Sequence, residues 1–235
     1  MKNFKKNVRK RLAIFDIDGT IFRSSLLVEL TEALIRAEIF PKKVRQKYLL
    51  ANQRWLNRQG LYENYIKAVV EVFFQNIKGV QEKDFIKIAK KTILLHQDRV
   101  YRYTRDLVKS LKKKKFYLLA ISNSPKMIVD EFAKKMGFDK TYGQMYEINK
   151  NGKFTGKIIS SELIADKAKI LKRVLAKEEI TLKGSIGVGD TESDIAFLKI
   201  VEKPICFNPN KKLYQTAKHH GWQIIVERKN VIYYL

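Results

Sequence analysis

The sequence predicts an α/β fold, a doubly wound and mostly parallel sheet with an α-helical cap domain inserted after the first strand. Three observations support this. The chain has 235 residues, of which 45% are hydrophobic and 11% aromatic, enough to build a packed core. Short apolar runs alternate with helical patterns after residue 115, whereas residues 23–97 show helical periodicity and almost no strand pattern. We therefore assign residues 1–22 and 98–235 to the core and 23–97 to the cap.

The first half of the chain contains one expected strand followed by helices. Leu12–Ile17 is a short apolar run that ends at Gly19-Thr20, as a buried strand would. Helical spacing then continues to about Lys115. Breaks at Gly60 and Gly79 separate helices expected near 62–74, 82–95 and 100–111.

The second half alternates between strands and helices. Asn151-Gly152 suits a type I′ turn, so Tyr146–Ile158 is predicted to form a hairpin. The remaining expected strands are Phe116–Ile121, Ser185–Val188, Pro204–Phe207 and Trp222–Val226. The expected helices are Lys126–Met136, Ala165–Lys177, Ser193–Ile200 and Lys211–His219.

Composition excludes several kinds of site. A single cysteine, Cys206, excludes an internal disulfide framework and a cysteine-rich zinc site, and it favours a reducing, intracellular compartment. The three histidines lack the spacing of a metal cluster. No stretch approaches the roughly 20 apolar residues that span a membrane. Asp16 and Asp18 also interrupt the apolar run that directly follows the basic N-terminus, which makes it too short for a signal peptide, so we expect a soluble, cytoplasmic protein without a membrane partner.

Two carboxylates stand at the end of the first expected strand. Asp16 and Asp18 are two residues apart and therefore project to the same face. They lie at the carboxyl end of the strand, where open α/β sheets bind ligands. Because two close carboxylates repel each other, the pair predicts a divalent cation or a shared proton. An acidic turn is the alternative explanation for this pair alone.

A second carboxylate pair follows a later strand. Asp190 and Asp194 come after Gly187-Val188-Gly189 and are four residues apart. Acidic residues also favour helix N-termini, so this pair alone is equally compatible with a structural role. Two separate strands that each end in a pair of aspartates are best explained by one site for a hard cation.

The order of these motifs resembles a known family. Asp16-x-Asp18-Gly19-Thr20, a strand ending at Ser122, Lys167 in Lys-Ala-x-x-Leu, and Gly189-Asp190-x-x-x-Asp194 follow one another. This pattern resembles the haloacid dehalogenase (HAD) superfamily of phosphohydrolases, and the resemblance covers nearly the whole chain. The helical insertion between the first two motifs resembles the phosphoserine-phosphatase-like group, subfamily IB, which carries a helical cap.

The resemblance implies a role for each motif residue. Asp16 would be the nucleophile that forms an aspartyl-phosphate, and Asp18 would be the general acid and then the general base. Mg²⁺ would be bound by the Asp16 carboxylate, the Asp18 backbone carbonyl and Asp190. Ser122 and the backbone N–H of Asn123 would bind the phosphoryl oxygens. Lys167, rather than its competitor Lys169, would add a fixed positive charge. Asp194 would support the site by orienting Lys167 or a metal-bound water.

The substrate is less well defined by the sequence. The cap predicts a small phosphorylated metabolite, because a lid excludes water best around a compact ligand. Phosphoserine phosphatases place a glutamate soon after the first motif, to meet the amino group of the substrate. Ile21–Ser25 contains no acid, and the first one is Glu29, which argues against phosphoserine. Arg23, Arg54 and Arg58 are candidates for binding an anionic leaving group, although each also suits a solvated helix surface.

Two alternatives remain open. Lys and Arg total 48 against 24 Asp and Glu, a formal charge of +24, which would suit a polyanion- or nucleic-acid-binding protein. A solvated basic surface explains this charge equally simply, and we favour it. The densest basic clusters are Lys5-Lys6, Lys42-Lys43 with Arg45, and Lys112–Lys115. A phosphotransferase or phosphomutase could also use the same nucleophile. The sequence does not define an oligomeric state.

Overall fold

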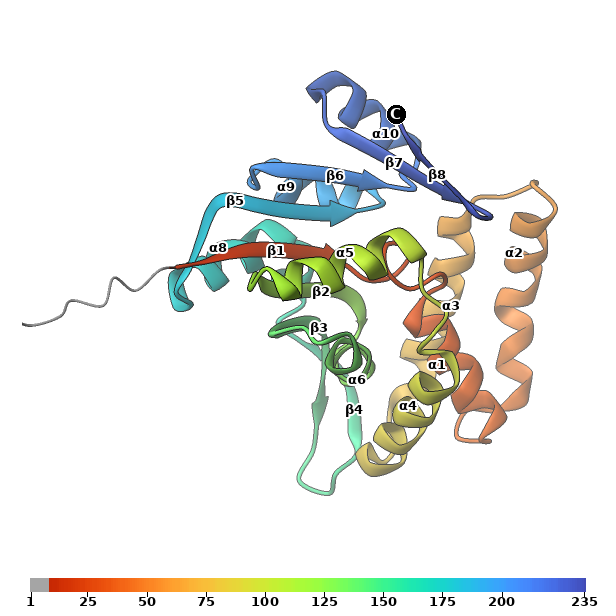
Figure 1. Cartoon of the computed structure of the whole chain (residues 1–235). Helices are drawn as coiled ribbons and strands as arrows, with labels where there is room; N and C mark the ends of the chain where they lie inside the picture. Colours follow the sequence, from red (N-terminus) through yellow and green to blue (C-terminus); the bar gives the residue numbers. More distant parts are fainter. Residues whose placement is uncertain (1–8) are drawn as a thin grey trace, which may run out of the picture.

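The computed structural model describes residues 9–235 and has one eight-stranded sheet at its centre (Figure 1). The strand order is β4-β3-β2-β1-β5-β6-β7-β8. The six central strands are parallel, and the two edge strands β4 and β8 run antiparallel to their neighbours. The predicted α/β class with a mostly parallel sheet is therefore confirmed.

The elements follow one another along the chain with two short 3₁₀ turns, η1 (Lys42–Arg45) and η2 (Glu192–Asp194). The strands are β1 (Lys10–Asp16), β2 (Tyr117–Pro125), β3 (Lys140–Ile148), β4 (Phe154–Ile159), β5 (Ile180–Gly189), β6 (Lys203–Phe207), β7 (Gln223–Arg228) and β8 (Val231–Tyr234). The helices are α1 (Leu26–Arg36), α2 (Gln46–Leu56), α3 (Tyr62–Ile77), α4 (Glu82–His96), α5 (Arg102–Lys113), α6 (Lys126–Met136), α7 (Ser161–Ala165), α8 (Lys167–Lys177), α9 (Ile195–Leu198) and α10 (Lys211–His220).

The two faces of the sheet bury two separate apolar layers. Along β1, Ala13 and Phe15 face the layer that contains α5 and α6, whereas Leu12 and Ile14 face the layer that contains α8, α9 and α10. This alternation follows from the two-residue period of a strand. Because both faces are covered, β1 is apolar over its whole buried length, as is typical of a central parallel strand.

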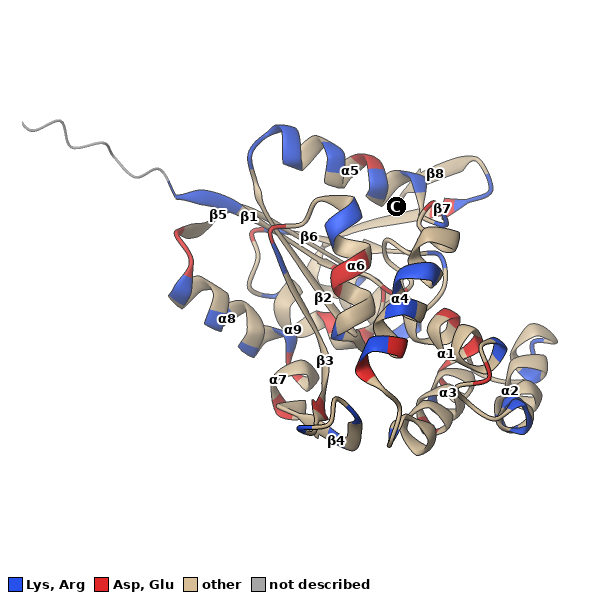
Figure 2. Ribbon diagram, turned by 90° about the horizontal axis from the view of Figure 1, so that it is seen from below, with Lys and Arg blue, Asp and Glu red and all other residues tan. Residues whose placement is uncertain are grey.

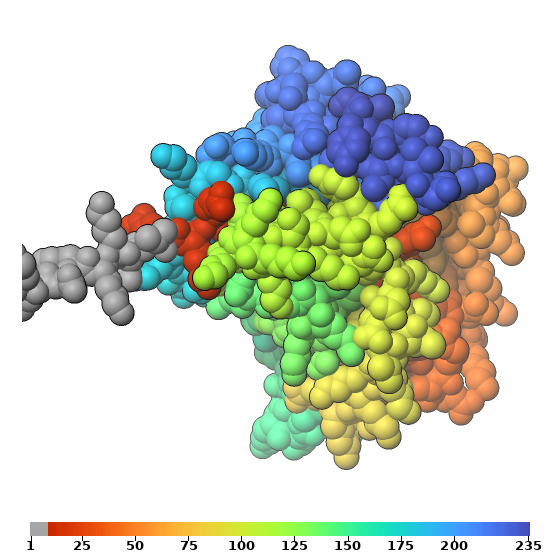
Figure 3. Space-filling view, in the orientation of Figure 1, coloured from red at the N-terminus to blue at the C-terminus, as the bar shows by residue number. Residues whose placement is uncertain are grey.

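Helices α1–α4 lie between β1 and α5 in the chain and gather at one side of the sheet (Figure 1). Their buried side chains belong to the same apolar layer as α5 and α6. Figure 3 shows α4 against the segment that holds α6, where Lys90 and Glu131 approach to 3.8 Å. The boundaries of the cap at 23 and 97 stay a prediction. Residues 1–8 of the predicted core lie outside the described residues.

Several predicted element boundaries were wrong. The helix expected over Ala165–Lys177 is divided at Asp166, whose carboxylate accepts hydrogen bonds from the backbone N–H groups of Ala168 and Lys169 and so starts α8 at Lys167. The helix expected over Ser193–Ile200 is reduced to the turn η2 and the four-residue α9. Strand β8 was not predicted.

The hairpin between β3 and β4 is present, but its turn differs from the predicted type I′. That turn needs positive φ at both central residues. Among the described residues only Gly152 of the Asn151-Gly152 pair has a positive φ, +69°. Asn149 closes the loop instead, because its side-chain Oδ1 accepts hydrogen bonds from the N–H groups of Asn151 and Lys153.

The described part of the chain contains no helix long and apolar enough to cross a membrane. Cys206 is buried in β6 as a free thiol.

Candidate active site

Three neighbouring strands bring the predicted site residues to one edge of the sheet. β1 pairs with β2 so that Asp16 lies beside Ile121, and with β5 so that Phe15 lies beside Val188. The residues that follow Ile121 and Val188 are therefore adjacent to those that end β1. Because all three strands are parallel, their carboxyl ends meet where ligands bind in such sheets.

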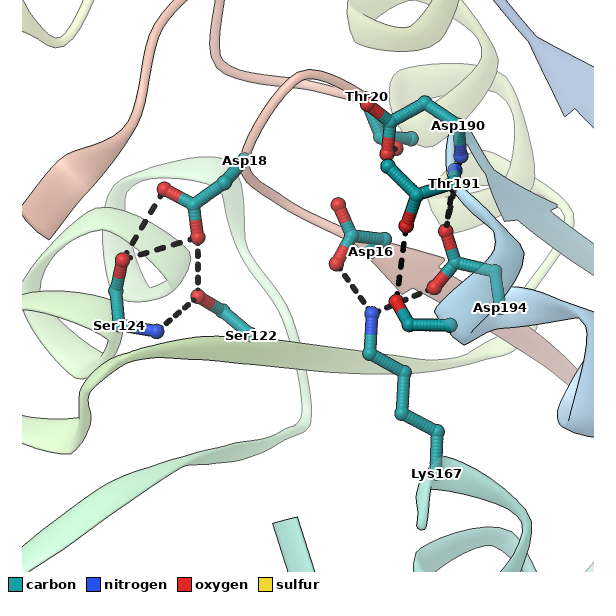
Figure 4. A network of polar contacts seen from close by, with 10 residues as sticks. Asp16, Asp18, Thr20, Ser122, Ser124, Lys167, Asp190, Thr191 and Asp194 are labelled. Atoms are coloured by element: carbon teal, nitrogen blue, oxygen red, sulfur yellow. Dashed lines mark hydrogen bonds and ion pairs between the residues drawn. The ribbon is translucent and has the colours of Figure 1, made fainter. Parts of the chain in front are cut away.

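Lys167 connects two of the predicted carboxylates (Figure 4). Its Nζ donates to Oδ1 of Asp16 and to Oδ1 of Asp194, both at 2.5 Å. The Lys167 side chain is 3% exposed, and those of Asp16 and Asp194 are 8% and 0% exposed. One buried ammonium thus offsets two buried carboxylates, which would be very costly to bury without it.

Asp194 is held in place from its other side. Its Oδ2 accepts hydrogen bonds from the N–H groups of Asp190 and Thr191, at 3.0 and 3.1 Å. A side chain at position 189 would collide with it, because a Cβ on Gly189 would lie 2.5 Å from the Asp194 carboxylate. Both oxygens of Asp194 therefore have protein partners. This geometry supports the expectation that Asp194 orients Lys167.

Asp18 lies in a second group with Ser122 and Ser124 (Figure 4). Its carboxylate accepts from the hydroxyl of Ser122, from that of Ser124 at 3.0 Å, and from the N–H of Leu26 at 2.5 Å. Burial raises the pKa of Asp18 above its ordinary value, and these hydrogen bonds oppose that rise. A raised pKa favours the protonated form that a general acid requires.

The two predicted phosphate-binding residues of β2 differ in environment. Ser122 is buried, and its only hydrogen is donated to Asp18. The Ser122 hydroxyl can donate to a phosphoryl oxygen only when its hydrogen bond to Asp18 is broken. Asn123 is exposed at the end of the same strand. Their role in phosphate binding stays a prediction.

Two residues that sequence reasoning missed support the carboxylates. Ser124 contacts Asp18 and also accepts a hydrogen bond from the N–H of Leu27 at 3.1 Å, which joins β2 to α1. Thr20 donates from its hydroxyl to Oδ1 of Asp190 at 3.0 Å. Thr20 belongs to the first motif, but nothing in the sequence spacing indicates a partner 170 residues away.

The carboxylates form a group that fits a divalent cation. Asp16, Asp190 and Asp194 each offer an oxygen within 4.8 Å of the others. Oδ2 of Asp16 is buried without a hydrogen-bond partner. Burial raises the pKa of Asp16 to about 7, against the lowering effect of Lys167, and burial together with the charge of Asp16 raises that of Asp190. A bound cation with oxygen ligands would relieve both the repulsion and the unpartnered oxygen.

Lys169, the competing lysine, is exposed on α8 and lies outside this cluster. Its backbone N–H contacts Asp166, but among the described contacts its ammonium has none with the site carboxylates.

Comparison with known proteins identifies the family. The model of the haloacid dehalogenase-like hydrolases matches residues 13–199, a span that includes every predicted site residue. The chain belongs to this family. The predicted resemblance to a HAD-type hydrolase is thereby confirmed.

Individual relatives of this haloacid dehalogenase-like hydrolase are distant. The phosphoserine phosphatase of Archaeoglobus fulgidus is 25% identical over 213 residues, which cover 90% of this chain and 56% of that protein. The chain thus spans little more than half of that relative. The histidinol-phosphatase of Neisseria meningitidis is 22% identical, with 92% and 98% of the two chains covered. The solved phospho-aspartyl intermediate analogue of phosphoserine phosphatase matches with a TM-score of 0.60 at 21% identity, covering 94% of this chain and 95% of that one. This last likeness shows that the two proteins share a fold.

Proposed function

We propose that this hydrolase is a Mg²⁺-dependent phosphomonoesterase that works through an aspartyl-phosphate on Asp16 and acts on a small phosphorylated metabolite. The observation that carries the proposal is the environment of the Asp16 carboxylate. One oxygen is held by Lys167, whereas the other is buried and has no hydrogen-bond partner, and an oxygen of Asp16 lies within 4.8 Å of one of Asp190. Such a carboxylate is held in a fixed orientation and keeps one oxygen for a cation.

The reaction would proceed in two displacements. A carboxylate oxygen of Asp16 attacks phosphorus, the bond from phosphorus to the ester oxygen breaks, and Asp18 gives its proton to the departing oxygen. Water then attacks the phosphorus of the aspartyl-phosphate. Asp18 takes a proton from this water, the bond from Asp16 to phosphorus breaks, and phosphate leaves with the carboxylate restored. The raised pKa of Asp18 supports both of its roles.

The charge on the transferred group would be balanced by several residues. When bound by the carboxylates of Asp16 and Asp190 and the backbone carbonyl of Asp18, Mg²⁺ supplies positive charge next to the phosphoryl oxygens. Lys167 contributes a fixed positive charge from the opposite side of Asp16, and Asp194 keeps it in position. Ser122 and the N–H of Asn123 would bind phosphoryl oxygens from β2.

The names of the relatives indicate the substrates to try first. The relatives include a phosphoserine phosphatase and a histidinol-phosphatase, and both names refer to small phosphomonoesters as substrates. Neither substrate can be carried over directly at 25% and 22% identity.

The deciding experiment measures phosphate release from a panel of small phosphomonoesters, with Mg²⁺ and with a chelator. We expect metal-dependent hydrolysis by the wild type and a loss on the order of 10³-fold or more in Asp16→Asn. Asp106→Asn, which makes the same chemical change on the exposed outer side of α5, is the matched control and should retain activity. Activity that survives in Asp16→Asn would refute the nucleophile. Transfer of phosphate to added glycerol in preference to water would favour the phosphotransferase alternative.

A further inference from the structure

Arg23 lies five residues after Asp18, directly after Phe22, which forms a backbone bridge with Asp18. Arg23 is exposed, and its guanidinium carbon lies 5.5 Å from the centre of the Tyr101 ring. Within residues 9–235, no described ion pair involves this guanidinium. The cation is therefore free to bind an anion while Tyr101 supports its face.

The backbone fixes Arg23 and Tyr101 close to the site. The N–H of Gly19 donates to the carbonyl of Phe22 at 3.0 Å, which folds the loop after β1 back on itself. The N–H of Arg23 donates to the carbonyl of Arg99, and that of Tyr101 donates to Ile21, both at 2.9 Å. Two segments that are far apart in the sequence thus hold the arginine and the ring beside the aspartate motif.

Tyr101 packs at the end of β6, whose residue Cys206 pairs with Gly189, the residue before Asp190. Burial raises the pKa of the Tyr101 hydroxyl, the Arg23 guanidinium lowers it, and the Asp190 carboxylate raises it. The Tyr101 ring also packs edge-on against Phe207 at the end of β6, with ring centres 5.0 Å apart. Tyr101 therefore contacts Arg23 and lies near the strand end that carries Asp190.

A second tyrosine, Tyr62, comes from the inserted helices. Tyr62 begins α3, is 37% exposed and packs on Trp55 with ring centres 4.9 Å apart. Burial raises the pKa of its hydroxyl, and the carboxylates of Asp18 and Asp190 add to this rise. The Asp190 carboxylate thus acts on the hydroxyls of both Tyr62, from α3, and Tyr101, which precedes α5.

Glu29 in α1, the first acidic residue after Asp18 in the sequence, is not free to bind an amine of the substrate. Glu29 accepts hydrogen bonds from Arg99 at 2.5 Å and from Ser24 at 3.0 Å, and its other oxygen lies 3.3 Å from Nε2 of His96. Because these partners already balance its charge, an ammonium group on the substrate finds no free carboxylate there.

We propose that Arg23 determines specificity by binding an anionic group, a carboxylate or a second phosphate, on the leaving group of the phosphomonoester. The rings of Tyr62 and Tyr101 flank the carbon skeleton between that anion and the reacting phosphate. A guanidinium presents a planar pair of N–H donors that matches both carboxylate and phosphate. This inference rests on the proposed phosphatase function and narrows its substrate class.

The test uses substrates that differ in one group at a time. Phosphoglycolate carries a carboxylate, O-phosphoserine a carboxylate and an amine, phosphoethanolamine an amine, and glycerol 2-phosphate neither. Fructose 1,6-bisphosphate and fructose 6-phosphate form a pair that differs by a second phosphate. We expect the wild type to prefer phosphoglycolate over glycerol 2-phosphate, or fructose 1,6-bisphosphate over fructose 6-phosphate, by about 10-fold or more in kcat/KM. Which pair shows the larger preference identifies the anion.

Variants of Arg23 then connect the preference to this side chain. Arg23→Ala should lose at least about 10 times more kcat/KM on the anionic member of each pair than on its partner, mainly through KM. Arg23→Lys, which keeps the charge but not the fork, should lose less. Arg173→Ala removes one exposed positive charge from α8 and should leave the preference as it is.

The outcomes separate the inference from the function on which it rests. Equal losses on all substrates in Arg23→Ala, or a preference for phosphoethanolamine over glycerol 2-phosphate, would overturn the role of Arg23 while leaving the phosphatase intact. Hydrolysis of no substrate by the wild type would contradict the proposed function and with it this inference.

Discussion

Lys167 carries the positive charge that two buried carboxylates share. Because Asp16 and Asp194 each approach its Nζ to 2.5 Å, replacing Lys167 leaves two buried anions without compensation. We predict that Lys167→Met lowers the free energy of unfolding by about 3–5 kcal/mol and abolishes phosphate release. Lys169→Met, two residues away and exposed, should change stability by no more than about 0.5 kcal/mol. Urea unfolding followed by circular dichroism measures both.

The pH dependence of this difference has a definite sign. Burial raises the pKa of Asp16 to about 7 from 3.8, so the folded state binds more protons and stability from this group falls as pH rises between those values. Lys167 lowers the pKa of Asp16, so removing Lys167 raises this pKa further. The free energy of unfolding then falls with pH over a wider range in Lys167→Met than in the wild type. The gap between wild type and Lys167→Met should therefore be larger near about pH 8 than near about pH 5. A gap that widens toward acid would contradict this account of the ion pair.

A site residue could be predicted from the sequence when it belongs to a recognisable motif, and not when its role comes only from partners that are distant in the sequence. Asp16, Asp18, Asp190 and Lys167 stand at strand ends or in motifs that can be recognised by spacing. Ser124 acts through contacts with Asp18 and the N–H of Leu27, 106 and 97 residues away, and a serine after a strand is an ordinary helix-capping residue. Only the folded arrangement reveals such a partner.

At the scale of elements, the crossing of β3 over the start of α6 supports the Asp18 side of the site. Gly143 is buried in β3, and a Cβ there would lie 2.6 Å from Cα of Lys126 and 3.1 Å from the carbonyl oxygen of Ser124. Backbone atoms cannot rotate away as a side chain can. Gly143 therefore lets β3 approach the segment that carries Ser124.

We predict that Gly143→Ala destabilises the protein by about 1–3 kcal/mol and lowers kcat, because Ser124 and its contact with Asp18 must shift. Gly60→Ala is the comparison variant, since a Cβ there would first meet the Arg54 side chain at 3.2 Å, and it should change stability by no more than about 1 kcal/mol. Thermal unfolding and steady-state kinetics of both variants provide the measurement. Full stability in Gly143→Ala would show that the crossing is looser than described.

The central strands could be predicted because they are buried on both faces and read as continuous apolar runs. The edge strand β8 could not, because Val231–Tyr234 is four residues long, mostly exposed and preceded by a turn with Lys229 at a φ of +53°. The break between α7 and α8 was missed for a similar reason. The cap made by Asp166 competes with helix continuation, and propensity alone does not decide between them.

For the whole molecule, the formal charge of +24 is distributed rather than concentrated. Figure 2 shows Lys and Arg on α2, α4, α5, α6 and α8, in different directions from the sheet. Of the predicted clusters, Lys112–Lys115 lies at the end of α5 and Lys42-Lys43 with Arg45 lies in η1, while Lys5-Lys6 is outside the described residues. Over the described residues 9–235, such a distribution forms a broad positive field rather than a single binding stripe.

A broad field attracts anionic substrates from a distance, so its effect belongs to the encounter step. We predict that raising KCl from about 20 to about 300 mM lowers kcat/KM severalfold on a phosphomonoester and leaves kcat nearly constant, because mobile ions screen charges that are more than about 10 Å apart.

The contrasting possibility, a nucleic-acid-binding protein, requires a contiguous basic surface that holds a polyanion at physiological salt. Asp16→Asn separates the two, since it removes turnover and leaves the surface charges in place. If this variant bound a short oligonucleotide tightly at about 150 mM salt, the basic residues would form a binding surface in their own right. Weak binding by Asp16→Asn that disappears with salt, together with a salt-sensitive kcat/KM of the wild type, would assign the charge to attraction of the small substrate toward the active site.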